Sequence, residues 1–181
     1  STLMAFTQSG DEVLLCDNAY GPTKRFCHKI LAKYNVKTTH IESNIGEEIS
    51  AYFNNKTKLI FLESPGSNTF EIQDIRAIVK AAKKAGIMII IDSTWATPLY
   101  LKSLDLGADV AIQSVTKYIC GHSDVLMGCA TVNEKYADEF ANYFETVENY
   151  TNPQDCYSAL RGLRSLKVRL KEHERSAFEV A

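Results

Sequence analysis

The chain has 181 residues, of which 45% are hydrophobic and 23% are charged. This composition is typical of a globular protein and argues against a disordered, collagen-like or coiled-coil chain. The 20 basic and 22 acidic side chains give a net charge of −2, without the basic excess of a nucleic-acid-binding protein. The longest apolar run, Ile87–Ile91, is too short to span a bilayer, and no signal peptide is recognisable. We therefore expect neither a nucleic-acid partner nor a membrane partner.

Five cysteines are scattered along the chain, at Cys16, Cys27, Cys120, Cys129 and Cys156. Their number is odd and no two form a CxxC pair, so neither a disulfide framework nor a structural metal site is expected. Free thiols suit a reducing compartment, and we expect a cytoplasmic protein. Because Cys16 and Cys129 fall in strand-like apolar runs, both are predicted to be buried, inert thiols.

Short strand-like apolar runs recur along the first 132 residues. They are Glu12–Asp17, Lys37–Ile41, Lys58–Glu63, Ile87–Asp92, Val110–Ser114 and Leu126–Val132. The third and fourth, KLIFLE and IMIIID, are nearly continuous hydrophobic stretches. Such runs are typical of strands buried on both faces of a parallel sheet.

Helical patterns separate the strand-like runs, at Thr23–Tyr34, Gly46–Phe53 and Ile72–Ala85. In the last of these, apolar residues recur at helical spacing from Ile72 through Val79, and Gly86 follows as a C-cap. Strands alternating with helices predict an α/β fold, a mostly parallel sheet with helices on both faces.

The last quarter of the chain is predicted to be helical, at Glu134–Glu148 and Gln154–Glu174, with a break at Thr151-Asn152-Pro153. Its arginine-rich stretch, Arg161–Arg175, is interpreted as a solvated helix face or a hinge. Both ends of the chain are abrupt, which suggests one domain that continues beyond them.

Polar and aromatic residues follow most of the predicted strands. Ligands of an open parallel sheet bind beyond the carboxyl ends of its strands, so these residues are the candidates for chemistry. No GxGxxG or GxxxxGK[ST] phosphate loop is present, which excludes the Rossmann dinucleotide and P-loop sites.

Lys117 stands out among the strand-end residues, because Ser114 and Thr116 flank it. The amine of Lys117 can form a Schiff base with an aldehyde, and the hydroxyls of Ser114 and Thr116 can bind a phosphate group. Asp92 offers a carboxylate to a protonated ring nitrogen, and Tyr20 offers a flat face on which a ring can stack. These are the parts of a pyridoxal phosphate (PLP) site. The residues alone leave two plainer interpretations open, a solvated surface lysine and an Asp-Ser-Thr helix cap.

Five strings carry a resemblance to a known family: DNAYGPTKRFC, FLESPGSNTFE, IDSTWATP, SVTKYICGHSDVLMG and ALRGLRSLKVRLKEH. In order and over essentially the whole chain, they resemble the Cys/Met-metabolism family of PLP enzymes, and most closely its bacterial-type cystathionine β-lyase branch. The resemblance implies the large domain of a fold type I (aspartate aminotransferase-like) transferase. It also implies PLP as cofactor and a homotetramer whose active sites are shared between subunits.

By position in this family pattern, Lys117 matches the lysine that binds the cofactor covalently and Asp92 the partner of its ring nitrogen. Tyr20 matches the tyrosine that stacks on the ring and could assist proton transfer. Ser114 and Thr116 match the hydroxyls that bind the phosphate. Lys117 and Tyr20 are therefore the expected catalytic residues.

The string ESPGS differs from the ESPxNP pattern of many family members, because Ser67 replaces the asparagine near the cofactor's ring hydroxyl. It resembles the β-lyase branch, which implies β-elimination of L-cystathionine to homocysteine, pyruvate and ammonia in methionine biosynthesis. The γ-synthase, γ-lyase and methionine γ-lyase activities of the family remain alternatives, as does a non-catalytic homologue that keeps only the fold.

Residues 1–150 are expected to form the central PLP-binding domain, with its start upstream, and residues 151–181 a helical connection to a C-terminal domain. The family places the arginine for the substrate carboxylate in that further domain, rather than at Arg161 or Arg164. It places the phosphate-binding glycines and the residues of the neighbouring subunit upstream of Ser1.

Four further residues near the expected site are given plainer roles. Trp95 is interpreted as packing beside the site, and Glu63 as a buried hydrogen-bonding residue at a strand end. His122 and Asp124 are interpreted as orienting the loop after Lys117.

Overall fold

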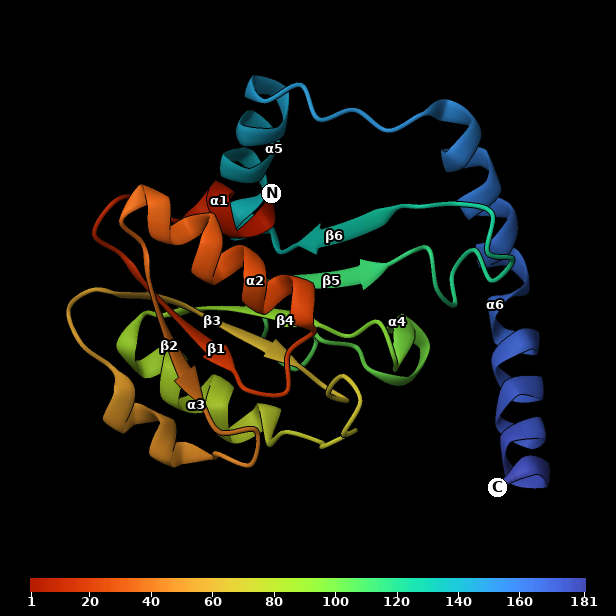
Figure 1. Ribbon diagram of the computed structural model, residues 1–181, viewed down its shortest axis with the longest axis horizontal. Coiled ribbons are helices and arrows are strands. Elements are labelled where there is room, and N and C mark those ends of the chain that lie inside the picture. The colour runs from red at the N-terminus through yellow and green to blue at the C-terminus, as the bar shows by residue number, and fades with distance from the viewer.

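The computed structural model describes residues 1–181, which fold around one six-stranded sheet (Figure 1). The strand order is β2-β1-β3-β4-β5-β6; β1 to β5 run parallel, and β6 is antiparallel to β5. The strands are β1 (Glu12–Cys16), β2 (Lys37–Ile41), β3 (Thr57–Glu63), β4 (Met88–Asp92), β5 (Val110–Ser114) and β6 (Gly128–Val132). All six predicted strands are present, within two residues of their predicted ends, and the mostly parallel α/β fold is confirmed.

The centre of the sheet is the hydrophobic core. In β3 the residues from Leu59 to Leu62 are almost inaccessible, and in β4 the same is true from Met88 to Ile91. This confirms that the two continuous apolar runs are covered on both faces. Because parallel strands leave both faces to be covered by helices, neither run shows the alternation of a half-exposed strand.

Helices lie on both sides of the sheet (Figure 1). On one side are α1 (Thr2–Phe6), α2 (Gly21–Lys29) and α5 (Ala137–Thr146), and on the other are α3 (Ile75–Ala85) and the 3₁₀ helix η2 (Glu47–Tyr52). The short α4 (Thr97–Tyr100) follows β4. Phe6 stacks on Phe140 with ring centroids 5.6 Å apart, which ties α1 to α5.

The helix α3 begins three residues later than its pattern predicted. The Asp74 carboxylate accepts a hydrogen bond from the Ala77 amide at 3.0 Å, and this cap fixes the start at Ile75. Ile72 therefore lies outside the helix and is 71% exposed, so its assignment to the apolar face was wrong. At the other end Gly86 adopts a left-handed φ of 69°, which confirms the predicted C-cap.

Two other predicted helices differ in kind. The segment Thr23–Tyr34 is divided between α2 and the 3₁₀ helix η1 (Leu31–Tyr34), which ends at a left-handed Asn35 with φ 59°. The segment Gly46–Phe53 is the 3₁₀ helix η2 rather than an α-helix. Both segments are short connections that return the chain directly to a strand, and tighter helical turns are common in such positions.

The chain after β6 is helical, as predicted. A 3₁₀ turn η3 (Glu134–Tyr136) leads into α5, and the 28-residue α6 (Pro153–Val180) follows the break. The Asn152 side chain accepts from the Gln154 amide at 2.8 Å, and Pro153 occupies the first turn. The helix α6 stands at one end of the sheet beside the loops that follow β5 (Figure 1).

All five cysteines are free thiols, but their burial differs. Cys16 is buried in β1, and burial raises its thiol pKa to about 12, as expected of an inert residue. Cys129 is exposed, so its predicted burial was wrong. It lies on β6, an edge strand whose residues are mostly accessible. No helix in the structure combines the length and apolar character needed to cross a membrane.

Candidate active site

The carboxyl ends of β3, β4 and β5 meet at one cavity of about 780 Å³. Strand register places Glu63 at the end of β3 directly beside Asp92 at the end of β4. All five residues predicted for the site line this cavity: Tyr20, Asp92, Ser114, Thr116 and Lys117. The structure therefore brings together residues that lie far apart in the sequence, from Tyr20 to Lys117.

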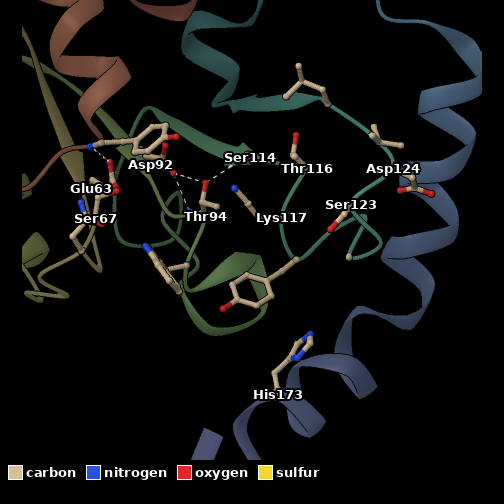
Figure 2. A pocket seen from close by; sticks show the side chains of 17 residues that line it. Glu63, Ser67, Asp92, Thr94, Ser114, Thr116, Lys117, Ser123, Asp124 and His173 are labelled. Carbon is tan, nitrogen blue, oxygen red and sulfur yellow. Dashed lines mark hydrogen bonds between the residues drawn. The ribbon is translucent and has the colours of Figure 1, made fainter. Parts of the chain in front are cut away.

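Asp92 is a partly buried carboxylate held in place by Thr94. Its Oδ1 accepts from the Thr94 hydroxyl at 2.6 Å and from the Thr94 amide at 3.0 Å (Figure 2). Burial raises the pKa of Asp92, and the two bonds from Thr94 oppose that rise only in part. Asp92 forms no salt bridge with any lysine, arginine or histidine of the chain. A cation placed beside it would therefore be strongly favoured.

Thr94 joins the ends of two strands, and sequence reasoning did not assign it a role. Besides holding Asp92, its hydroxyl oxygen accepts from the Ser114 amide at 2.8 Å. The end of β5 is thus fixed relative to the carboxylate on β4. The available signal was the Asp92-Ser93-Thr94 string, in which a threonine two residues after an aspartate can bond back to it.

Lys117 lies in the turn after β5, with its side chain exposed and directed toward Thr94 and Asp92 (Figure 2). Its amide donates to the Ser114 carbonyl at 3.0 Å, and its carbonyl accepts from the Gly121 amide at 2.8 Å. The Nζ atom makes no hydrogen bond or salt bridge within the chain. The main chain of Lys117 is thus held, while its amine is available for reaction.

The two hydroxyls predicted to bind phosphate differ in how they are engaged. Thr116 Oγ donates to the Met127 carbonyl at 3.2 Å and accepts from the Met127 amide at 2.8 Å. To donate to a phosphate, Thr116 must release the Met127 carbonyl. Ser114 Oγ has no partner in the chain and is free to donate.

Tyr20 reaches the cavity from the start of α2, with 53% of the residue exposed. Its amide donates to Glu63 Oε2 at 2.7 Å, and the hydroxyl of Ser67 donates to Glu63 Oε1 at 2.5 Å. Glu63 is only 4% exposed, and burial raises its pKa. It is a buried hydrogen-bonding residue, as the sequence suggested, and it links two loops that line the cavity.

Aromatic residues form one wall of the cavity. Trp95 packs edge-to-face on Phe70 at 4.9 Å, and Tyr118 lies between Trp95 and His173 at centroid distances of 6.3 and 5.7 Å. This agrees with the interpretation of Trp95 as packing beside the site. His173, on α6, had not been predicted near the site.

His122 and Asp124 follow Lys117 closely in the sequence but differ in their contacts. His122 Nδ1 lies 2.5 Å from the Cys120 carbonyl, a contact that orients the loop as suggested. Asp124 lines the cavity and forms no salt bridge.

One arginine of α6 contacts the turn that carries Lys117. Arg169 donates to the carbonyls of Tyr118 and Ile119, at 2.7 and 3.0 Å. The interpretation of the whole stretch Arg161–Arg175 as a solvated face or hinge was therefore wrong for Arg169. Periodicity gave no means of separating it from the exposed Arg161 and Arg164.

The fold and the cavity together define a class of protein. A mostly parallel sheet presents a partly buried, unpaired carboxylate, a free amine, a free hydroxyl and an aromatic face at its carboxyl edge. Asp92 fits a protonated ring nitrogen, Ser114 a phosphate oxygen, and Lys117 an aldehyde, so the residues present fit PLP.

The chain belongs to the Cys/Met metabolism PLP-dependent enzyme family, whose model matches residues 1–181. It is 43% identical over 179 residues to a putative cystathionine beta-lyase of Saccharomyces cerevisiae, covering 99% of this chain and 53% of the relative. It is 40% identical over 183 residues to the cystathionine beta-lyase MetC of Escherichia coli, covering 100% and 46%.

Other relatives carry other names. A cystathionine gamma-lyase of Dictyostelium discoideum is 34% identical to this chain, and the match covers 99% of this chain and 47% of the relative. An L-alanine/L-glutamate racemase of Wolbachia pipientis is 40% identical over 99%, covering 44% of the relative. The crystal structure of cystathionine gamma-lyase from Lactobacillus plantarum complexed with L-serine superposes with a TM-score of 0.89 at 28% identity, over 92% of this chain and 44% of that one. The chain spans about half the length of the curated relatives it matches.

Proposed function

We propose that the protein carrying this chain is a carbon–sulfur lyase that eliminates the thiol from the β-carbon of L-cystathionine. The products are homocysteine, pyruvate and ammonia, which would place the reaction in methionine biosynthesis. The meeting of Lys117, Asp92, Tyr20 and Ser114 at one cavity is the observation that best supports the PLP chemistry that this elimination requires. The frequency of the name cystathionine beta-lyase among the relatives favours this substrate.

The proposed division of labour follows from where each group lies. When bound, PLP supplies an electron-accepting ring that stabilises negative charge on the substrate α-carbon. Asp92 is proposed to keep a proton on the facing ring nitrogen, because its carboxylate has no other cationic partner. Ser114 and Thr116 are proposed to hold the phosphate, and Tyr20 to lie against the ring face.

Lys117 is proposed to bind the cofactor covalently before the substrate arrives and to act as base afterwards. Its Nζ, which has no competing hydrogen bond, would take the proton from the substrate α-carbon. The electron pair left on the α-carbon then forms the α,β double bond as the bond between the β-carbon and sulfur breaks, and the sulfur leaves with its bonding electrons. Tyr20 or the protonated Lys117 could give that sulfur its proton. Water hydrolyses the resulting aminoacrylate to pyruvate and ammonia.

The arrangement of the whole protein is also a proposal. Residues 1–150 would form the central cofactor domain, and residues 151–181 the helical connection to a C-terminal domain. The family resemblance suggests a homotetramer with shared active sites. The half-exposed Leu160 and Leu163 on α6, at 49% and 47%, support a surface that another part of the assembly covers.

A second candidate is elimination at the γ-carbon. It is favoured by the structural likeness to a cystathionine gamma-lyase and by the Dictyostelium relative. The family chemistry at the α-carbon is shared by both reactions and by racemisation, so the cofactor residues do not discriminate between them. Ser67, in the slot where many family members have asparagine, is our reason for preferring β-elimination.

Product analysis of the intact protein with L-cystathionine tests the proposal. Pyruvate is the expected keto acid, whereas 2-oxobutyrate would establish γ-elimination. Absence of both, with D-alanine formed from L-alanine, would establish a racemase. In parallel, borohydride reduction and peptide mapping should place the cofactor label on Lys117. A label on Lys102 or Lys135 would overturn the site.

A further inference from the structure

The turn that carries Lys117, residues Ser114–Gly121, is only partly stabilised by its own backbone. Amides of Lys117, Cys120 and Gly121 donate to carbonyls within it, at 2.8–3.0 Å. The carbonyls of Tyr118 and Ile119 accept no such bond and face α6. Tyr118 and Ile119 are the two residues that follow Lys117 directly.

Arg169 supplies the missing donors. Its Nη1 donates to the Tyr118 carbonyl at 2.7 Å and its Nη2 to the Ile119 carbonyl at 3.0 Å. The guanidinium is held within its own helix by the Gly162 carbonyl at 2.8 Å and the Ser165 hydroxyl at 3.0 Å. Arg169 forms no salt bridge, so all its hydrogen bonds are donated to uncharged oxygens. The two-pronged contact requires a planar fork, which a lysine cannot provide.

Two glycines allow this close approach, one on each side of the contact. A Cβ atom at Gly162 would lie 2.2 Å from the Ile119 carbonyl oxygen and 2.7 Å from that of Cys120. A Cβ atom at Gly121, where φ is +75°, would lie 2.1 Å from Arg169 Nη1. The helix backbone therefore packs directly against the turn. Gly162 has no room for alanine, and at Gly121 the left-handed φ makes any side chain strained.

We propose that Arg169 is a positioning residue for Lys117, fixing the main chain from which the amine extends. The inference rests on the proposed role of Lys117 as the cofactor-binding lysine. Since Lys117 Nζ has no partner in the chain, the turn alone determines where the amine starts, and α6 holds the turn through Arg169. A shift of α6 would thus be transmitted to the reacting nitrogen.

The experiment compares variants of α6 in the intact protein. Arg169→Lys keeps the positive charge but loses the planar fork, and Gly162→Ala pushes the helix off the turn with Arg169 intact. Ser165→Ala removes the acceptor for Arg169 Nε, together with the hydrogen bond that the Ser165 hydroxyl donates to the Gly162 carbonyl at 3.1 Å. Arg164→Lys is the matched exposed control. Leu166→Ala, one turn before Leu170 on the buried face, is the control for general loss of helix packing.

Four quantities are measured for each variant: the thermal midpoint, the pH midpoint of the Schiff-base absorbance band, hydrogen exchange of the turn in the cofactor-free protein, and the turnover of cystathionine. We expect Arg169→Lys and Gly162→Ala to shift the band's pH midpoint. We also expect exchange at residues 117–121 to be faster than in wild type, with β3 unchanged. Cystathionine turnover should fall about tenfold or more, since small misplacements of a reacting group are costly. Ser165→Ala should act in the same direction but less.

The controls separate positioning from stability. Arg164→Lys should match wild type throughout, and Leu166→Ala should lower the thermal midpoint while leaving the band's pH midpoint in place. The inference is overturned if Arg169→Lys behaves like Arg164→Lys, or if Leu166→Ala shifts the band as much as Arg169→Lys does. Should Arg169→Lys fail to fold, the same criteria apply to Ser165→Ala and Gly162→Ala. If wild-type protein carries no label at Lys117, the proposed function itself has failed, which is a distinct result.

Discussion

The two sides of the cavity are built by different means. On one side, Glu63 and Asp92 end adjacent parallel strands in register, and their neighbours in those strands are buried. On the other side, Lys117 is exposed on a turn whose outward carbonyls are held by Arg169 on a distant helix. The position of the carboxylates is thus fixed by the register of the sheet. The position of the lysine turn is fixed by its contact with α6, the C-terminal helix of the chain. Substitutions on the two sides should therefore have different signatures.

The largest effect is expected at Lys117. Replacing it with alanine removes both the covalent attachment and the base, so turnover of cystathionine should fall by about 10⁴-fold or more. The fold should be retained, because the side chain is exposed and its Nζ makes no hydrogen bond or salt bridge within the chain. Steady-state kinetics and a thermal melt of the cofactor-free protein check this. Substantial activity in Lys117→Ala would remove the basis of the site.

Asp92→Asn should lower turnover by about 100-fold or more, because a preorganised charge is lost while the shape is kept. In the cofactor-free protein, by contrast, the same substitution should stabilise the fold. Burial raises the folded-state pKa of Asp92, so the carboxylate destabilises the empty protein increasingly as pH rises through that pKa.

The free energy of unfolding of cofactor-free Asp92→Asn should therefore exceed that of wild type near neutral pH. The difference should shrink as pH falls and Asp92 takes up its proton. Urea melts across this pH range measure it. A variant less stable than wild type at neutral pH would show that Thr94 bonds, and not burial, dominate the energetics of Asp92.

An intermediate effect is expected at Glu63, which holds Tyr20 and Ser67 by accepting from both. Glutamine offers one acceptor oxygen and turns an NH₂ group toward the other donor, so Glu63→Gln should cost about 1–3 kcal/mol of stability. Tyr20→Phe, which keeps the ring and the backbone amide, is the matched comparison and should leave stability nearly unchanged. Equal melting of Glu63→Gln and wild type would contradict the contacts described for this side of the cavity.

The smallest effect is expected for substitution of an exposed cysteine. Reactivity of the thiols should distinguish the buried interior from the exposed edge of the sheet. Cys129 on β6 and Cys156 on α6 are exposed, whereas Cys16 and Cys27 are buried, with thiol pKa values raised by burial to about 12 and about 11. A thiol reagent applied to the native protein should label the first pair quickly and the second only on unfolding. Cys129→Ser should change stability by less than about 0.5 kcal/mol. Rapid labelling of Cys16 in the native state would contradict the packing of β1.

Much of the fold could be predicted because local patterns and burial agree at the sheet centre. The continuous apolar runs of β3 and β4 permit only strands covered on both faces, and Gly86 marks the end of α3. Predictions went wrong where a single local contact decided the matter. The cap at Asp74 excluded Ile72 from the helix, and the edge position of β6 exposed Cys129.

The candidate site divides in the same way. The sequence by itself determined that a lysine, a carboxylate, a tyrosine and two hydroxyls follow strands of a parallel sheet, because strand order along the chain carries such residues to one edge. Only the tertiary structure decided that Thr94 joins Asp92 to Ser114, and that Arg169 rather than Arg161 or Arg164 meets the lysine turn. Arginines on one helix are alike in sequence. What distinguishes Arg169 is a pair of carbonyls, 50 and 51 residues away along the chain, that packing at Gly162 brings within hydrogen-bonding distance.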